Sequence, residues 1–250
     1  MGQRIVGSHI PACRYLDRVR VRSALGRVAR VAIPGVRHVH GQVARYAALW
    51  DDANTLAVTG VGPLWVVLGD STAQGIGAPS HDQGYVGQLR PRLDAERGDE
   101  GRWRILNWSR SGAKTQDVID VQLPRLEALE PRPALVTCAI GANDLRPTPL
   151  EVLIERLRHI MGRLPAGAVF ATLPQGLRPE KAVVANEVIR SEAPGHGLLV
   201  ADVWAHTGPP WRGKVASDGF HPGLRGYADW AAAFAEALGL PPAGPVGSQP

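Results

Sequence analysis

Apolar residues gather in five short runs along this chain, and stretches with a helical spacing of apolar residues lie between them. Short runs rich in Val, Ile and Leu and bounded by turn residues are typical of strands that are buried on both faces of a sheet. The predicted strands are residues 64–68, 103–107, 134–140, 168–173 and 198–203. Because strands and helices alternate, the pattern predicts an α/β domain with a mainly parallel sheet.

Five helices are expected between and after these strands, at residues 85–97, 116–129, 150–164, 181–191 and 227–238. The start of the third helix is the clearest. Thr148 can cap it, Pro149 suits the first helical position, and Glu151 completes a capping box. Pro124 lies inside the second helix, so we expect a kink or an early end there.

The first sixty residues have a different pattern and a strongly basic character. Residues 1–50 contain nine Arg, no Lys and one Asp, a net charge of +8; the whole chain carries +5, so the other 200 residues carry −3. Two amphipathic helices are expected here, separated by a break at residues 33–35. Their apolar positions are Leu16, Val19, Ala24, Val28 and Val31 in the first, and Val36, Val39, Val43, Ala47 and Trp50 in the second. We therefore divide the chain into a basic helical arm (1–60), an α/β domain (61–240) and a flexible tail rich in Pro and Gly (241–250).

The role of the basic arm has three interpretations. The simplest is two helices that dock on the domain and leave their arginines in solvent. A basic amphipathic helix also suits the surface of an anionic membrane. The third interpretation is binding of nucleic acid, which is not expected because aromatic interleaving and a known binding motif are lacking. No run of residues is apolar enough to cross a bilayer or resembles a secretory signal. We expect a cytoplasmic protein, with peripheral contact at the inner membrane face as the alternative.

Length and cysteine content limit the fold further. A chain of 250 residues, 44% of them hydrophobic, is long enough for one well-buried core. Cys13 and Cys138 are the only cysteines, and Cys138 lies inside a predicted strand, so no disulfide framework is expected. No Cys/His cluster has zinc-ligand spacing, and no glycine-rich phosphate loop occurs. We therefore expect neither a metal nor a nucleotide cofactor.

Candidate catalytic residues follow the carboxyl ends of the first three predicted strands, namely Ser71, Gly112 and Asn143. Ligands bind at this edge of an open parallel sheet. A serine hydroxyl becomes a good nucleophile when a histidine accepts its proton, and a carboxylate must hold that histidine in the correct tautomer. His221 and Asp218, on the loop before the last helix, can fill these two roles.

Each of these residues also has a simpler interpretation when it is taken singly. A Gly-Asp-Ser run after a strand is often a turn with a helix cap, Gly112 can serve only to turn the chain, and His221 can be an exposed loop histidine. Their occurrence together and in this order favours catalysis. The backbone N–H groups of Ser71 and Gly112 and the side-chain amide of Asn143 are then the donors for a negative oxygen on the substrate.

Four blocks of the sequence resemble, in order, those of the SGNH, or GDSL-type, hydrolase family. They are Gly69-Asp70-Ser71, Gly112, Gly141-Ala142-Asn143-Asp144 and Asp218-Gly219-Phe220-His221. The resemblance runs from about residue 64 to about residue 238, and it departs at Thr72, where the family often has Leu or Ile. It implies a three-layer, flavodoxin-like α/β fold with a five-stranded mainly parallel sheet and helices on both faces. It also implies that Ser71, Asp218 and His221 form a catalytic triad, and that Ser71, Gly112 and Asn143 form the oxyanion hole.

The resemblance leaves the substrate open, because the family covers esterases, thioesterases, lysophospholipases and carbohydrate deacetylases. We expect hydrolysis of an ester with a short or medium acyl chain. The alternative is a relative that binds an acyl group without hydrolysing it, or that transfers it. Trp204 and Trp211 are candidates for lining an acyl pocket, and they serve equally well to fix their loop onto the domain.

Two further expectations concern the loops of this site. Gly75, Gly77 and Gly84 predict a mobile loop after the candidate nucleophile. Asp70 and Asp144 are expected to satisfy nearby backbone donors, and so to order their loops rather than to act in catalysis.

Overall fold

A sheet of five parallel strands, in the order β2-β1-β3-β4-β5, forms the centre of the molecule. The computed structural model describes residues 33–98, 101–176 and 178–242. The strands are β1 (Leu64–Gly69), β2 (Arg104–Asn107), β3 (Leu135–Ala139), β4 (Val169–Ala171) and β5 (Leu199–Ala201). Each predicted strand is present, with ends within two residues of the predicted ones. The prediction of an α/β fold with a parallel sheet is confirmed.

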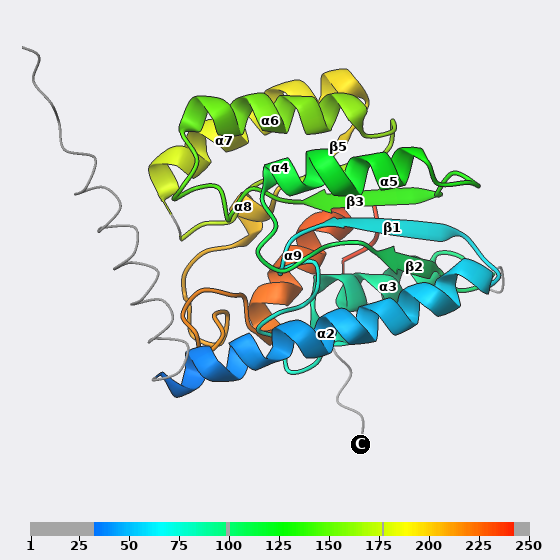
Figure 1. Ribbon diagram of the computed structural model, residues 1–250, viewed down its shortest axis with the longest axis horizontal. Helices are drawn as coiled ribbons and strands as arrows, with labels where there is room; N and C mark the ends of the chain where they lie inside the picture. The colour runs from blue at the N-terminus through cyan, green and yellow to red at the C-terminus, as the bar shows by residue number, and fades with distance from the viewer. Residues whose placement is uncertain (1–32, 99–100, 177, 243–250) are drawn as a thin grey trace, which may run out of the picture.

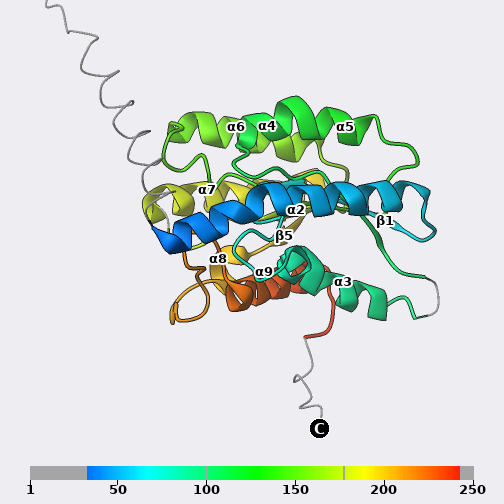
Figure 2. The ribbon, with the colours of Figure 1, turned by 60° about the horizontal axis from the view of Figure 1, so that its bottom comes forward.

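Helices cover both faces of the sheet, which therefore lies between two helical layers (Figure 2). One face packs against α4 (Thr115–Asp117), α5 (Leu123–Glu127), α6 (Leu150–Arg163) and α7 (Pro179–Glu192). The other packs against α3 (Tyr85–Ala95), α8 (Val203–His206) and α9 (Leu224–Ala237). Side chains alternate along β1, so that Val66 belongs to the first apolar core and Val67 to the second. This double burial explains why the strands appear as continuous apolar runs in the sequence.

A long helix, α2 (Pro34–Thr59), lies along the edge strand β2 (Figure 1). The side-chain amide of Asn54 pairs with the backbone of Asn107, accepting from its N–H at 2.7 Å and donating to its carbonyl oxygen at 2.9 Å. Trp50 and Ala57 belong to the two apolar cores. The helix thus covers a sheet edge that would otherwise expose unpaired backbone groups.

The position of α2 changes the predicted division of the chain. The second amphipathic helix is present with the expected face, since Val39 and Trp50 are buried and Val43 is partly buried. It is an integral layer of the domain, however, whereas the sequence placed residues 1–60 in a separate arm. The first predicted helix, with Leu16 to Val31, lies outside the described residues, as do Cys13 and most of the predicted tail. Within the described ranges, none of the helices combines the length and apolarity that a membrane span requires.

The capping box predicted at the start of α6 is wrong. Pro149 directly precedes the helix, and no side chain caps its first turn. The hydroxyl of Thr148 donates instead to a carboxylate oxygen of Asp144 at 2.9 Å. Because Asp144 is fully buried, its carboxylate needs that donor more than the solvent-accessible helix end does.

The irregularity expected near Pro124 is present. The helix becomes π-helical over Val118–Gln122 and then continues as α5, with Pro124 in its first turn. A proline cannot donate to the carbonyl four residues earlier, and a π-helical turn is a common way to accommodate this loss.

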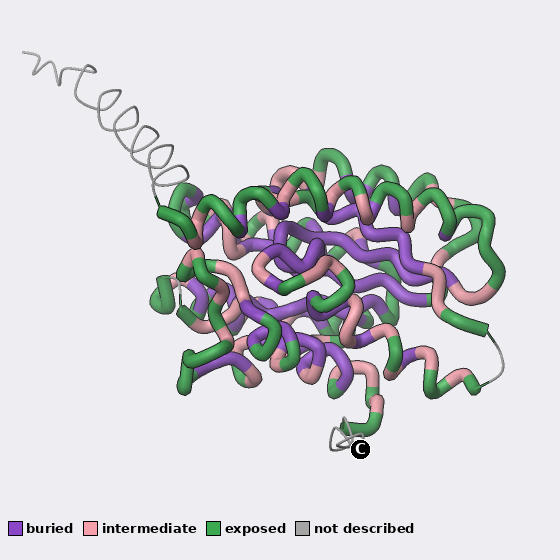
Figure 3. The backbone as a smooth tube through the Cα atoms, turned by 90° about the horizontal axis from the view of Figure 1, so that it is seen from below, coloured by how far each residue is buried: buried purple, intermediate pink, exposed green. Residues whose placement is uncertain are grey.

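The loop after β1 is packed into the domain, in line with the burial of the central segments in Figure 3. A Cβ atom on Gly84 would lie 2.5 Å from the Cα of Gly75, and one on Gly77 would lie 2.4 Å from the carbonyl oxygen of Pro222. The three glycines of this loop therefore allow backbone segments to approach each other closely. The sequence did not indicate this packing role, and the mobility of the loop stays a prediction.

Candidate active site

The candidate nucleophile Ser71 lies just after the carboxyl end of β1, where the chain enters a series of tight turns. Gly69 ends the strand with a φ of +144°, and a Cβ atom there would lie 2.3 Å from the carbonyl oxygen of Ala139. The side chain of Gln122 accepts from the Gly69 N–H at 2.8 Å and donates to the Gly69 carbonyl at 2.9 Å. The end of the strand just before Ser71 is therefore held by hydrogen bonds to both its N–H and its carbonyl group.

Asp70 and Asp144 order the loops beside the site, as predicted. An oxygen of Asp70 accepts from the N–H and the hydroxyl of Thr72, at 2.9 and 2.8 Å. The Asp144 carboxylate accepts from the N–H and the hydroxyl of Thr115, at 2.9 and 3.1 Å. Burial raises the pKa of Asp70, although the hydrogen bonds from Thr72 oppose this shift.

Ser71, His221 and Asp218 lie in one hydrogen-bonded row. His221 Nε2 is 2.9 Å from Ser71 Oγ, and His221 Nδ1 is 2.6 Å from Asp218 Oδ2. The other oxygen of Asp218 accepts from the backbone N–H groups of Phe220 and His221, at 3.0 and 3.1 Å. The structure thus brings together three residues that are up to 150 positions apart in the sequence.

The environment of Asp218 favours its ionised form. Partial burial raises the pKa of this carboxyl, but the hydrogen bonds from the His221 ring and from the two backbone N–H groups outweigh that effect, so its pKa is below the ordinary value. An ionised carboxylate can only accept, so the proton on the His221 ring lies at Nδ1. Nε2 then faces Ser71 with a free electron pair.

The three predicted oxyanion donors are held in different ways. Neither the N–H of Ser71 nor that of Gly112 donates a hydrogen bond within the described part of the chain. Gly112 has a φ of +80°, which only glycine adopts readily. The Asn143 amide donates to the carbonyl oxygen of Ala113 at 2.9 Å and, more weakly, to Asp70 Oδ2 at 3.3 Å.

A cavity of about 270 Å³ opens over this row. Ser71, Asn143 and His221 lie in its wall, and most of the remaining wall is apolar, formed by Leu145, Pro174, Trp211, Val215, Phe220 and Trp230. Of the two predicted pocket tryptophans, Trp211 lines the cavity. Trp204 does not line it, and packs instead against the apolar core that lies under α6 and α7. A role for Trp204 in substrate contact therefore has no support from its position.

Several buried amides around the site were missed in the sequence. The side chain of Gln74 accepts from the N–H and the hydroxyl of Ser111, at 3.2 and 2.6 Å, and donates to the Ser109 carbonyl at 3.1 Å. It thereby ties the loop of Ser71 to the loop of Gly112. For Gln122 a signal can be read in retrospect, because it is a single amide inside an otherwise apolar helical face.

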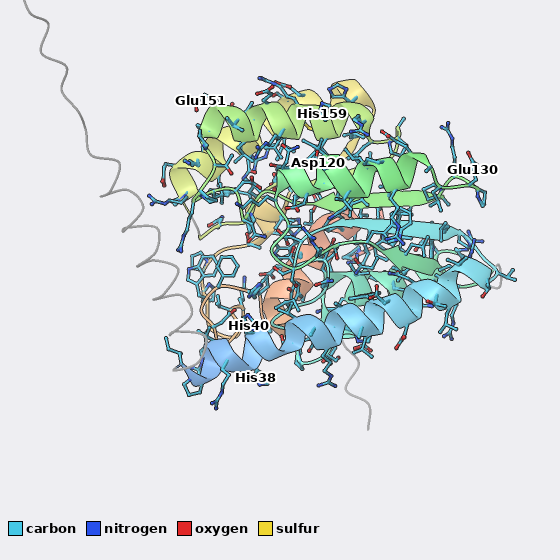
Figure 4. The ribbon with its side chains drawn as sticks, viewed as in Figure 1. His38, His40, Asp120, Glu130, Glu151 and His159 are labelled. Atoms are coloured by element: carbon cyan, nitrogen blue, oxygen red, sulfur yellow. The ribbon has the colours of Figure 1, made fainter. Side chains whose placement is uncertain are left out.

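Other histidines lie away from this row. His38, His40 and His159 are exposed on helix surfaces (Figure 4). Among the residues that the structure describes, no group of three or more His, Cys, Asp or Glu side chains is arranged to hold a metal ion. Cys138 is buried in β3 without a disulfide, and burial raises the pKa of its thiol.

Comparison with known families agrees with this geometry. The sequence model of the GDSL-like lipase/acylhydrolase family matches residues 67–228, which is more than half of the chain. The chain therefore belongs to the GDSL-like lipase/acylhydrolase family, as the resemblance in the sequence indicated, and it is a carboxylic-ester hydrolase.

Similar solved structures share the fold. The crystal structure of TesA is 26% identical, covers 70% of this chain and 97% of its own, and superposes with a TM-score of 0.57. Axe2, an acetylxylan esterase from Geobacillus stearothermophilus, is 20% identical over 73% of this chain and 96% of its own, with a TM-score of 0.56. The lipase Lip_vut3 from a goat rumen metagenome is 16% identical over 70% of this chain and 97% of its own, with a TM-score of 0.54. The comparison with curated proteins gave no match.

Proposed function

We propose that this protein hydrolyses esters of short to medium acyl chains through an acyl-enzyme on Ser71. The observation that carries the proposal is the row Ser71–His221–Asp218, of which Ser71 and His221 lie in the wall of a largely apolar cavity. Such a row activates a hydroxyl for attack on a carbonyl carbon, and an apolar cavity suits the acyl group that carries this carbonyl.

In the first half of the reaction, Ser71 Oγ attacks the carbonyl carbon and its proton passes to His221 Nε2. Ionised Asp218 stabilises the imidazolium that forms. When the tetrahedral intermediate collapses, the bond to the leaving alcohol breaks and His221 returns the proton to the leaving oxygen. The acyl group is then an ester of Ser71.

The negative oxygen of the intermediate needs donors that are already in place. The N–H groups of Ser71 and Gly112 have no internal acceptor in the described residues, so they are available to it. The weaker bond of the Asn143 amide, the one of 3.3 Å to Asp70, is the one that a substrate oxygen can replace. The stronger bond to Ala113 keeps the amide oriented meanwhile.

In the second half, a water molecule attacks the acyl carbon while His221 takes one of its protons. Collapse of the second intermediate breaks the bond to Ser71 Oγ, which regains its proton from His221. The product is the free carboxylic acid, and the enzyme returns to its starting state.

The cavity favours acyl groups of limited size. At about 270 Å³ it is at or just below the lower end of the range for small-molecule sites, and Trp211 and Phe220 form part of its wall. The Axe2 enzyme acts on acetylated xylan, so acetylated xylooligosaccharides belong in the same substrate panel as simple esters.

The test is hydrolysis of p-nitrophenyl esters from acetate to hexanoate, of a matching acyl thioester and of an acetylated xylooligosaccharide. Ser71→Ala serves as the control. We expect turnover of the esters that Ser71→Ala loses entirely, with a rate that falls beyond a limiting chain length. Equal turnover by the wild type and Ser71→Ala would contradict the proposal.

The same panel separates hydrolysis from the alternatives. Mass spectrometry that shows an acyl adduct on Ser71 without turnover, until an alcohol acceptor is added, would indicate an acyltransferase. Absence of any adduct and of turnover would indicate a protein that only binds acyl groups.

A further inference from the structure

Helix α2 lies entirely before residue 67, where the family match begins, yet it contacts the loop that carries Asp218 and His221. Its first turn passes beside the loop between α8 and α9 (Figure 1). The hydroxyl of Ser217 donates to the Gly35 carbonyl at 3.3 Å, and a Cβ atom on Gly35 would lie 2.2 Å from the Ser217 carbonyl oxygen. The helix and the catalytic loop are therefore in backbone contact.

Two turns further along, α2 holds the loop that follows Ser71. Gln42 is 8% exposed. Its Oε1 accepts from the N–H of Gly77 at 2.8 Å, and its Nε2 donates to the carbonyl of Ala78 at 3.1 Å. The hydroxyl of Tyr46 donates to the same carbonyl at 2.9 Å. The helix thus binds the N–H of Gly77 and the carbonyl of Ala78, on either side of the peptide bond that joins these two residues.

The opposite side of Gly77 touches the catalytic histidine. With a φ of +100°, Gly77 brings its backbone so close that a Cβ atom there would lie 2.9 Å from the Cβ of His221 and 2.4 Å from the Pro222 carbonyl oxygen. No side chain lies between these two backbones to absorb a shift. A displacement of Gly77 is therefore passed on to His221.

The bond that such a displacement would change is the one used for catalysis. His221 Nε2 and Ser71 Oγ are 2.9 Å apart, and proton transfer requires this separation to stay within hydrogen-bond reach. We propose that Gln42 is a positioning residue, which acts through Gly77 to hold His221 against Ser71. The inference rests on the proposed function of that pair and adds to it a residue outside the matched family region.

The chain offers a matched control for Gln42. Asn54 lies on the same helix and also pairs a side-chain amide with a backbone N–H and a carbonyl, but its partner is Asn107 on the edge strand β2. Gln42→Leu and Asn54→Leu each remove two hydrogen bonds that dock α2. Only the first removes bonds to the segment that faces His221.

For Gln42→Leu we expect kcat on p-nitrophenyl butyrate to fall about tenfold or more with little change in KM, because misplacing a reacting group slows the chemical step. Asn54→Leu should keep the wild-type kcat, even where thermal unfolding shows that it is destabilised to the same extent. The second readout is the low-field proton resonance of the His221 Nδ1–H bonded to Asp218. It should shift or broaden in Gln42→Leu and stay unchanged in Asn54→Leu.

Equal kcat and equal low-field resonance in the two variants would overturn the proposal. If Gln42→Leu does not fold, Gln42→Met decides in its place, because it keeps the length of the side chain and removes the same two hydrogen bonds. A lower kcat with a shifted resonance supports the proposal, and no change in either refutes it. The low-field resonance can be observed without turnover. A wild-type chain that shows the resonance but does not hydrolyse esters would refute the proposed function. The positioning inference would then be decided by whether the resonance shifts in the Gln42 variant.

Discussion

At the scale of single residues, Asp218 shows how one side chain can have two separable duties. Its Oδ1 accepts from two backbone N–H groups and so shapes the loop, whereas its Oδ2 accepts from the His221 ring. A substitution that keeps the first oxygen and replaces the second can therefore leave the fold and change the chemistry.

Asp218→Asn is that substitution. The amide keeps the oxygen that accepts from the backbone, but its NH₂ group cannot accept from Nδ1–H, so His221 should adopt the wrong tautomer. We expect kcat to fall by about 10³- to 10⁴-fold. The midpoint of urea unfolding should remain close to that of the wild type. Near-normal turnover on p-nitrophenyl esters would show that Asp218 does not orient the ring.

The pH dependence of the reaction should contain no contribution from Asp218. Because the pKa of Asp218 is lowered, this carboxylate stays ionised over the range in which an imidazole takes up its proton. Protonation of Nε2 removes the base, so kcat/KM should fall as the pH is lowered through this range. A plot of log kcat/KM against pH should fall toward acid, with intrinsic fluorescence confirming that the protein stays folded. A flat profile would contradict the assignment of His221 as the base.

At the scale of elements, side-chain amides on helices fix the ends of strands. Gln122 pairs with both backbone groups of Gly69 at the end of β1, and Asn186 pairs with both backbone groups of Leu173 after β4. Both amides are almost completely buried. Strand ends leave N–H and carbonyl groups without a neighbour, and a carboxamide, with one donor and one acceptor side by side, satisfies both.

Gln122→Leu should therefore destabilise the fold and impair the site together. Two buried backbone groups of Gly69 would lose their partners, at a cost of about 1–3 kcal/mol each in the free energy of unfolding. Because Gly69 is two residues before the proposed nucleophile, Ser71, kcat should fall as well. Urea unfolding and ester hydrolysis measure the two effects.

Gln116→Leu is the matched control on the same helical segment, since the amide of Gln116 bonds only to the exposed Asp120 at 2.8 Å. Gln116→Leu should change the free energy of unfolding by no more than about 0.5 kcal/mol. If Gln122→Leu behaves like this control, the amide does not fix the strand end.

The sequence was sufficient for the strands, most of the helices and the row of Ser71, Asp218 and His221, because apolar runs and ordered motifs are local patterns. It did not reveal the amides at the strand ends, since their partners are backbone groups that any residue supplies. It misplaced Thr148 for a related reason: a hydroxyl beside a helix start suits a cap, and only the fold places the buried Asp144 within its reach. It did not reveal the packing role of the loop glycines, because close packing and mobility select the same residue.

At the scale of the whole molecule, α2 joins the basic sequence before it to the domain. Residues 1–32 contain seven Arg and one Asp, and the chain enters the described domain at Ile33. The boundary suggested by charge, near residue 60, would cut away Val39, Tyr46 and Trp50, which are all buried. We keep as a proposal that residues 1–32 bind anionic membrane surfaces.

A chain that begins at Ile33 tests this without disturbing the core. It should retain the ester hydrolysis of the full chain, and it should sediment less with vesicles rich in phosphatidylglycerol, because each basic residue near such a surface contributes about 1 kcal/mol. Neutral phosphatidylcholine vesicles and added salt are the controls, since salt screens the attraction. Equal sedimentation of both chains would dismiss the membrane role. A chain that begins at Gly60 should fail to fold, for loss of α2.

The contact between Gly35 and Ser217 has a mechanical consequence. Force applied through the chain ahead of Ile33 reaches the loop of Asp218 and His221 within a few residues, without crossing the sheet. A molecule anchored by its N-terminal side to a rigid support should therefore turn over more slowly under tension than the same molecule left slack.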